Sequence, residues 1–175
     1  VCSNNKQFNN TTIFEILPKN LPRMLSVGRL DMNSEGLLLL TNNPTLSSFL
    51  EHPKNKIKRK YLVKIIGEFR FHDKEKYEKS LNIEGVHYAS RKIKVIENKK
   101  KQSKIEIILE QGKNKEIRRI MNYFNLKVMK LKRIEYGPFK LHNIKKNEIS
   151  EVSENFLKKQ LKKMGFKDEN NFWKI

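Results

Sequence analysis

One aspartate occupies a position where a chain could use a carboxylate for chemistry. Asp31 lies with Arg29 between two glycines, directly before the aliphatic run 37–40. A rigid apolar element next to a carboxylate fixes the position of the carboxylate, as acid–base or nucleophilic catalysis requires. A turn-capping aspartate is the ordinary alternative, and the residue types alone favour it. Glu35 lies four residues away, but nothing indicates that the two acids form a glycosidase pair.

A second segment, residues 111–119, could bind an anion. A glycine turn precedes an expected helix, and the backbone N–H groups at the start of a helix attract phosphate or carboxylate. A solvated helix face explains the same residues equally well. The segment carries four cations, Lys113, Lys115, Arg118 and Arg119.

A third candidate is the pair Lys60 and Tyr61 at the start of an expected strand. An aromatic ring beside lysines can stack on a nucleobase, although an ordinary core tyrosine is the simpler interpretation. The four histidines lie at no metal-ligand spacing, and the single cysteine, Cys2, cannot build a metal cluster. We therefore expect no metal and no cofactor.

The charge of the chain predicts a polyanionic partner. Lysine and arginine number 38 against 19 acids, which leaves a formal charge of +19 on 175 residues. Each phosphate that such a surface neutralises releases counterions, so nucleic acid is the leading candidate. A proteome rich in lysine is the alternative explanation. No run approaches the roughly 18 apolar residues that span a bilayer, and the N-terminus has no signal pattern, so we expect a cytoplasmic protein without a membrane partner.

The elements that must position these residues are mixed. Alternation with a period of two predicts antiparallel strands, joined by a hairpin loop at 97–103, and Asn114 is the expected N-cap of a central helix. This pattern indicates an α+β class. Expected helices cover 13–17, 45–50, 73–81, 114–124 and 155–164, and expected strands cover 37–40 (buried), 61–66, 92–96, 104–109 and 126–134.

Four segments, in matching order and spacing, resemble the RsuA/RluB-like branch of the RNA pseudouridine synthases. The resemblance extends over about residues 18–149 and reverses the simpler interpretations of the aspartate, the tyrosine and the arginine. Departures from the family pattern at Asn43, Pro44, Gln111 and Lys115 affect substrate contacts more than catalysis. The segments are 28–31 followed by 34–42, the strand start 60–62, the helix start 112–119 and the strand 131–138.

The resemblance implies a pseudouridine synthase fold, with a mixed, mainly antiparallel sheet in two lobes flanked by helices and a central cleft. It implies isomerisation of a uridine in ribosomal RNA by a monomer that needs no metal or cofactor. Large-subunit rRNA is slightly favoured by residues 131–137, and small-subunit rRNA is the alternative. A non-catalytic RNA-binding or ribosome-assembly protein of the same fold is the alternative of another class.

The resemblance also assigns roles to residues. Asp31 is the catalytic carboxylate, by attack on the ribose, attack on the base or a glycal route. Arg118 pairs with it, and Tyr61 stacks on the target base or transfers a proton. Arg29 occupies the space that the flipped uridine leaves, and Ile117 forms an apolar wall. The substrate-binding set is Arg29, Lys60, Lys113, Asn114, Lys115, Ile117 and Arg119.

The expected domain organisation has two parts. Residues 1–150 form the catalytic domain, without a complete N-terminal RNA-binding module. Residues 151–175 form a basic helical extension that contacts RNA.

Overall fold

A computed structural model describes residues 11–167, so the expectations for Cys2 and for residues 168–175 lie outside the described residues. The chain divides into two compact units. Unit 1 contains the residues up to Met32, Leu38–Asn55 and the residues from His142 onward, and unit 2 contains Asn33–Leu37 and Lys56–Leu141. None of the helices within 11–167 is long and apolar enough to cross a bilayer.

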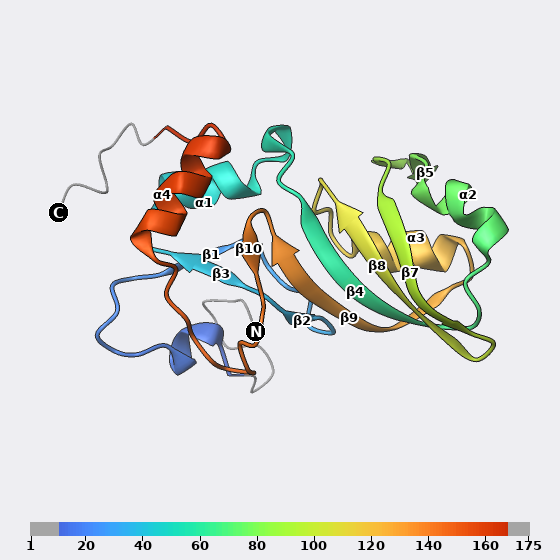
Figure 1. Cartoon of the computed structure of the whole chain (residues 1–175), viewed down its shortest axis with the longest axis horizontal. Coiled ribbons are helices and arrows are strands. Elements are labelled where there is room, and N and C mark those ends of the chain that lie inside the picture. The colour runs from blue at the N-terminus through green and yellow to red at the C-terminus, as the bar shows by residue number, and fades with distance from the viewer. Residues whose placement is uncertain (1–10, 168–175) are drawn as a thin grey trace. The chain divides into compact units, whose positions relative to one another are not determined.

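Unit 2 is built on one six-stranded sheet (Figure 1). Its strands follow the order β10-β9-β4-β8-β7, and each neighbouring pair is antiparallel. The short strand β2 pairs with β9 in parallel. The expectation of a mixed, mainly antiparallel sheet is therefore confirmed. The strands are β2 (Glu35–Gly36), β4 (Arg59–Ile66), β7 (Lys92–Lys99), β8 (Gln102–Leu109), β9 (Lys127–Tyr136) and β10 (Phe139–Lys140).

Helices cover only one face of this sheet in unit 2. Figure 1 shows α3 (Glu116–Tyr123) behind β7 and β8, and α2 (Lys74–Glu78) lies beside it after a 3₁₀ helix at Phe71–Asp73. A hairpin of β5 (Leu81–Ile83) and β6 (Val86–Tyr88) joins this layer. Alternate strand residues point into the core, and each such side chain contributes about 1.5–3 kcal/mol. The fully buried side chains of this core include Val63, Ile65, Ile105 and Ile107 of the strands and Ile120 and Met121 of α3.

Unit 1 contains a two-stranded sheet and two α-helices. Strand β1 (Leu25–Val27) pairs antiparallel with β3 (Leu39–Thr41). Asn43 caps α1 (Pro44–Glu51), because its side-chain oxygen accepts a hydrogen bond from Leu46 N at 2.9 Å. The remaining elements are 3₁₀ helices at Ile13–Ile16 and Pro53–Asn55 and the helix α4 (Glu154–Lys163).

The run of four leucines differs from the expected single buried strand. Leu37 is buried in unit 2, where its N–H donates to Arg133 O at 2.8 Å. Leu39 and Leu40 are only half-buried and belong to β3 in unit 1. The run is therefore divided between two sheets, because its two ends pair with different strands.

Three expected boundaries are also wrong. The helix expected at 73–81 ends at Glu78, and Leu81 already begins β5. The expected hairpin loop shrinks because β7 and β8 extend to Lys99 and Gln102. The other expected helices and strands are present, with ends that shift by a few residues.

Asn114 is not the N-cap of the central helix. Helix α3 begins at Glu116, and the cap position is Lys115, whose φ of 51° is left-handed. The Glu116 carboxylate instead accepts a hydrogen bond from the backbone N–H of Lys113 at 2.9 Å. Together with the bond that the Glu116 N–H donates to Lys113 O at 3.1 Å, this contact closes the turn that precedes the helix.

Candidate active site

Strand β4 directs its two candidate residues to opposite faces of the sheet. Tyr61 is half-buried and packs against the core, on the face of Val63 and Ile65. Lys60 points to the other face, where its ammonium contacts the Glu135 carboxylate at 3.1 Å. The tyrosine ring is thus positioned by the core and keeps part of its surface exposed, as a stacking platform requires.

Helix α3 holds Arg118 in a fixed orientation. Its Nη1 donates to Val128 O at 3.1 Å, and its Nη2 donates to Asn33 O at 2.5 Å. Its Nε is buried and has no hydrogen-bond partner among residues 11–167. The guanidinium is therefore tied to the segment that follows Asp31, and its buried Nε–H is unused.

The segment 33–37 is locked onto β9. Gly36 has a φ of +112°, and a Cβ atom there would lie 2.2 Å from Arg133 O, so glycine is required at this position. Arg133 Nε donates to Leu37 O at 2.7 Å, in addition to the backbone bond that Leu37 makes with Arg133. We call Arg118, Gly36 and Arg133 the segment clamp.

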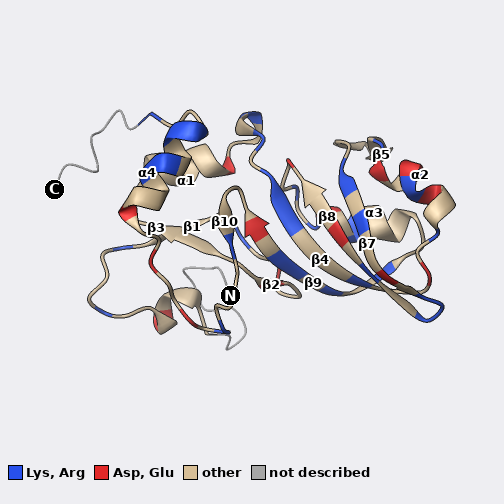
Figure 2. Cartoon of the chain, viewed as in Figure 1, with Lys and Arg blue, Asp and Glu red and all other residues tan. Residues whose placement is uncertain are grey.

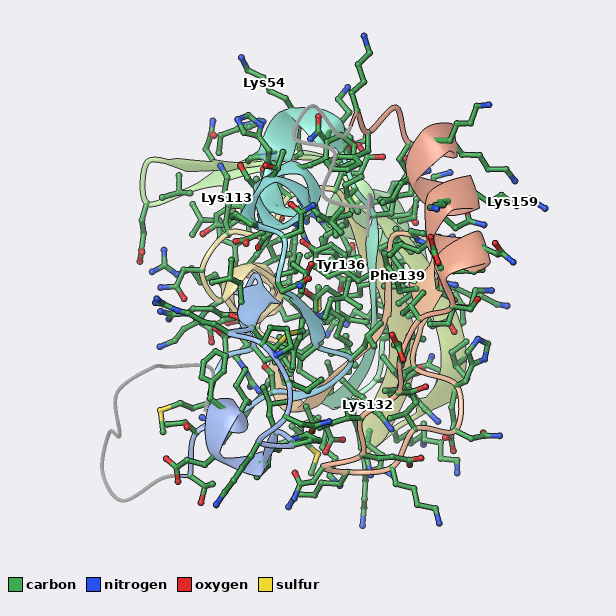
Figure 3. All side chains as sticks on the ribbon, turned by 90° about the vertical axis from the view of Figure 1, so that its left-hand side faces the viewer. Lys54, Lys113, Lys132, Tyr136, Phe139 and Lys159 are labelled. Carbon is green, nitrogen blue, oxygen red and sulfur yellow. The ribbon has the colours of Figure 1, made fainter. Side chains whose placement is uncertain are left out.

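The buried ring of Tyr136 contacts Arg133 of the clamp and a second arginine, Arg59. The guanidinium carbons of Arg59 and Arg133 lie 4.7 and 5.0 Å from the centre of the buried Tyr136 ring. Arg59 Nη2 also donates to the Tyr136 hydroxyl at 2.7 Å. Figure 3 shows Tyr136 and Phe139 lying among the other side chains, in agreement with their burial. Such stacked cations fix the position of Arg133.

Two buried ionisable side chains, Glu116 and Arg91, lie next to the loop that precedes α3. Burial raises the pKa of Glu116, against the opposing effects of its hydrogen bond with Lys113 and of the Arg91 charge. Burial likewise lowers the pKa of Arg91, which donates to the carbonyl groups of Tyr77, Lys79 and Ala89. The hydrogen bonds of Glu116 and Arg91 hold the glycine turn before α3 in one conformation.

The residues of that loop divide between surface and core. Lys113 donates to the carbonyl of His87, and its ammonium lies 5.7 Å from the Tyr88 ring centre. Asn114, Lys115 and Arg119 are exposed. Ile117 is 3% exposed and lies in the core of unit 2, where it supports the helix from within.

Asp31 and Arg29 belong to unit 1, in the loop between β1 and β2. The loop begins at Gly28, whose φ of 67° is left-handed. Asp31 is half-buried and Arg29 is exposed. Tyr61 and Arg118 belong to unit 2, so the expected meeting of Asp31 with Arg118 in a central cleft stays a prediction.

Unit 1 also contains a pocket of about 640 Å³ beside α1. Its polar lining includes Arg23, Ser47, Glu51 and His52, and it excludes Asp31. Among the described residues, no group of three or more histidine, cysteine, aspartate or glutamate side chains could hold a metal ion.

Comparison with known proteins decides the family. A family model described as RNA pseudouridylate synthase matches residues 2–123, more than half of the chain. The chain belongs to this family. The match contains Asp31, Tyr61 and Arg118, and its end lies inside α3.

Pseudouridine synthases of two bacterial genera are similar to the chain. An uncharacterized RNA pseudouridine synthase of Rickettsia typhi is 47% identical over 85% of the chain and 60% of its own length. The ribosomal large subunit pseudouridine synthase B of Buchnera aphidicola from Schizaphis graminum is 36% identical over 97% of the chain and 67% of its own length. The chain spans 60–64% of the length of the Rickettsia relatives.

Solved structures show the same fold. A crystal structure of a pseudouridylate synthase superimposes with a TM-score of 0.78 at 20% identity, over 85% of this chain and 65% of that chain. A structure of an H/ACA RNP bound to a substrate RNA gives a TM-score of 0.57 at 17% identity, over 89% and 50% of the two chains. The pseudouridine synthase fold expected from the sequence is confirmed.

Proposed function

We propose that the chain isomerises a uridine of ribosomal RNA to pseudouridine, with large-subunit rRNA as the substrate. The family and the name of the Buchnera relative support this activity and this substrate. The charge of +19 suits a polyanion. The observation that carries the proposal is the segment clamp, because it ties the chain just after Asp31 to the arginine that the family pattern pairs with it.

Chain connectivity limits how far Asp31 lies from Arg118. Arg118 Nη2 bonds the carbonyl oxygen of Asn33, and Asp31 precedes Asn33 by two residues. Two extended residues span at most about 7 Å. The family pattern supports the proposed pairing of the Asp31 carboxylate with the Arg118 guanidinium. A guanidinium within about 4–6 Å favours the ionised form of a carboxylate, even in a pocket that excludes water.

The target uridine has to leave its stack before the reaction begins. Flipping costs roughly a few kcal/mol, and stacking on Tyr61 returns about 1–3 kcal/mol. The N1–C1′ bond then breaks, the uracil turns, and a C5–C1′ bond forms, while C5 loses its proton and N1 gains one. Asp31 acts in this step on the ribose or on the base, or it assists a glycal route. This chemistry needs no redox step, metal or cofactor.

The remaining predicted residues hold the RNA around that base. Lys113, Asn114, Lys115 and Arg119 bind phosphate near the start of α3, and Arg29 fills the space of the flipped nucleotide. Lys60 adds a charge at the strand start, and Ile117 supports the apolar wall from the core.

In the proposed organisation, residues 1–150 are the catalytic domain of a monomer, and the basic segment 151–175 contacts RNA. Helix α4 supports this role, since Lys159 projects outward from it in Figure 3.

Release of tritium from rRNA labelled at uridine C5 tests the function. The wild-type chain should release tritium from large-subunit rRNA, and Asp31→Asn should release none. Asp73→Asn is the matched control, because Asp73 is an ion-paired acid outside the proposed site, and it should keep the activity. Release of tritium from small-subunit rRNA alone would show that small-subunit rRNA, and not large-subunit rRNA, is the substrate. No release from either rRNA would favour the non-catalytic RNA-binding protein.

A further inference from the structure

The face of the six-stranded sheet opposite α3 is unusually basic. Strand residues alternate between the two faces, and Ile93, Ile105, Ile107 and Leu131 point to the core. Their neighbours therefore point outward. We call the outward set the lysine face: Lys64 of β4, Lys92 and Lys94 of β7, Lys104 of β8, and Lys130 and Lys132 of β9.

Three of these lysines lie side by side across three strands. In the strand register, Lys64 is directly opposite Lys104 on one side and Lys130 on the other. Directly opposite residues have Cβ atoms about 4.5–5.5 Å apart, and like charges in such pairs destabilise a sheet. The fold thus keeps a row of three cations that costs stability.

The acids nearby do not neutralise this row. None of the three lysines has an ion-pair partner within 4.0 Å in the part of the chain that the structure describes. Glu97 lies near enough for Lys104 and Lys64 to lower its pKa, but its main partner is Lys99. Glu135 is paired with Lys60.

The rest of the face is also rich in cations. Figure 2 shows more Lys and Arg than acidic positions along β4 and β9, and strand alternation places Lys132 of β9 and Lys92 and Lys94 of β7 on this face. Glu106 is the acid in the middle of the face, opposite Leu62 and Lys94. Leu62 is half-buried, so the face combines apolar side chains with long cationic ones.

We propose that the lysine face binds the phosphate backbone of RNA, as a surface distinct from the Tyr61 side of the sheet. Charge complementarity carries the choice of partner: closely spaced cations that outnumber the acids around them, Glu97 opposite Lys104 and Glu106, are matched by closely spaced phosphates, which release counterions when neutralised. The contacts reach only the backbone, so this binding is independent of RNA sequence. RNA is also the partner in the proposed function, and the choice of partner rests on it, but the six residues of the lysine face are not among the residues of the proposed site.

The test compares two triple variants with the same change of net charge. One is Lys64→Gln, Lys104→Gln and Lys130→Gln. The control is Lys74→Gln, Lys76→Gln and Lys79→Gln, because these lysines lie on or next to α2 and pair with acids of the same region. Kd is measured over a salt series for a large-subunit rRNA transcript and for a transcript of unrelated sequence.

The lysine-face variant should lower the slope of log Kd against log salt by about 3, equally for both transcripts, since each lost phosphate contact removes about 1. The control should change it by less than about 1. Equal slopes for the two variants would overturn the proposal. So would an effect confined to the large-subunit transcript.

Thermal unfolding separates binding from folding. The lysine-face variant should have a Tm at or above that of the wild type, because its like-charge contacts are relieved. A lower Tm would overturn the proposal, since the row would then serve the fold. Absence of tritium release by the wild-type chain would refute the proposed function and leave the salt slopes unchanged, whereas equal slopes would refute only the lysine face.

Discussion

The two faces of the unit 2 sheet use the same strands for opposite purposes. On the face that α3 covers, Val63, Ile65 and Ile107 are fully buried, and the buried cation Arg91 is held by carbonyl groups. On the other face, Lys64 lies between two further lysines. The first face therefore stabilises the fold by burying apolar side chains. The second face carries like charges that lower the free energy of unfolding. The comparison predicts where a substitution affects folding and where it affects RNA.

The largest expected effect is a difference in the free energy of unfolding between substitutions at two neighbouring residues of β8. Ile107 is fully buried and Ile108 is half-buried on the opposite face. Ile107→Ala should reduce the free energy of unfolding by about 2–5 kcal/mol, because it leaves a cavity in the core. Ile108→Ala should cost clearly less. Urea unfolding measures both, and equal losses would mean that the two faces do not differ as described.

The next effect concerns two glycines with positive φ. Gly36→Ala places a Cβ 2.2 Å from Arg133 O, whereas a Cβ at Gly67 meets nothing within 4 Å. Both variants bear the left-handed strain of about 1–2 kcal/mol, and Gly36→Ala should lose about 1–3 kcal/mol more through overpacking.

Unfolding in urea and hydrogen exchange of the Leu37 amide report this difference. In Gly36→Ala the Leu37 amide should exchange faster, because the segment clamp loosens. Slow exchange together with losses that match those of Gly67→Ala would show that the clamp does not depend on glycine.

The smallest effect concerns the buried Glu116. Its pKa is raised above 4.5, so between that value and the raised pKa the native state binds more protons than the unfolded state. The free energy of unfolding that this group contributes is thus highest below pH 4.5 and falls as the pH rises through the raised pKa. Glu116→Gln should remove this dependence.

Unfolding at pH about 4 and about 7 measures the Glu116 effect. Relative to the wild type, Glu116→Gln should gain stability at the higher pH. If Glu116→Gln instead loses stability relative to the wild type as the pH rises, the charge of Arg91 has a larger effect on the pKa of Glu116 than burial has.

Much of the fold followed from local pattern. Alternation identified β7 and β8, and helical spacing identified α3, because both periods reflect a single buried face. The ordered motifs also identified the family, and the comparisons confirm it.

Other features depend on pairings between distant segments. The leucine run gave no sign that Leu37 and Leu39 join different sheets, since four apolar residues suit either strand. The row of three lysines depends on the register of β4 with β9, which irregularities at Lys60/Tyr61 and Lys64/Ile65 shift. Arg133 lies in the motif 131–138, but the motif does not reveal its contact with the segment 33–37. That contact depends on where the fold places Gly36.

The most direct test of the central claim, that Arg118 works with Asp31, compares adjacent arginines of α3. Arg118 is tied to Asn33, and Arg119 is exposed. Tritium release is measured at saturating rRNA beside the Kd of each variant. Arg118→Gln should abolish turnover with a modest change in Kd, whereas Arg119→Gln should weaken binding and keep most of the turnover. If Arg118→Gln instead weakens binding and keeps the turnover rate at saturation, Arg118 is a phosphate contact and the account is contradicted.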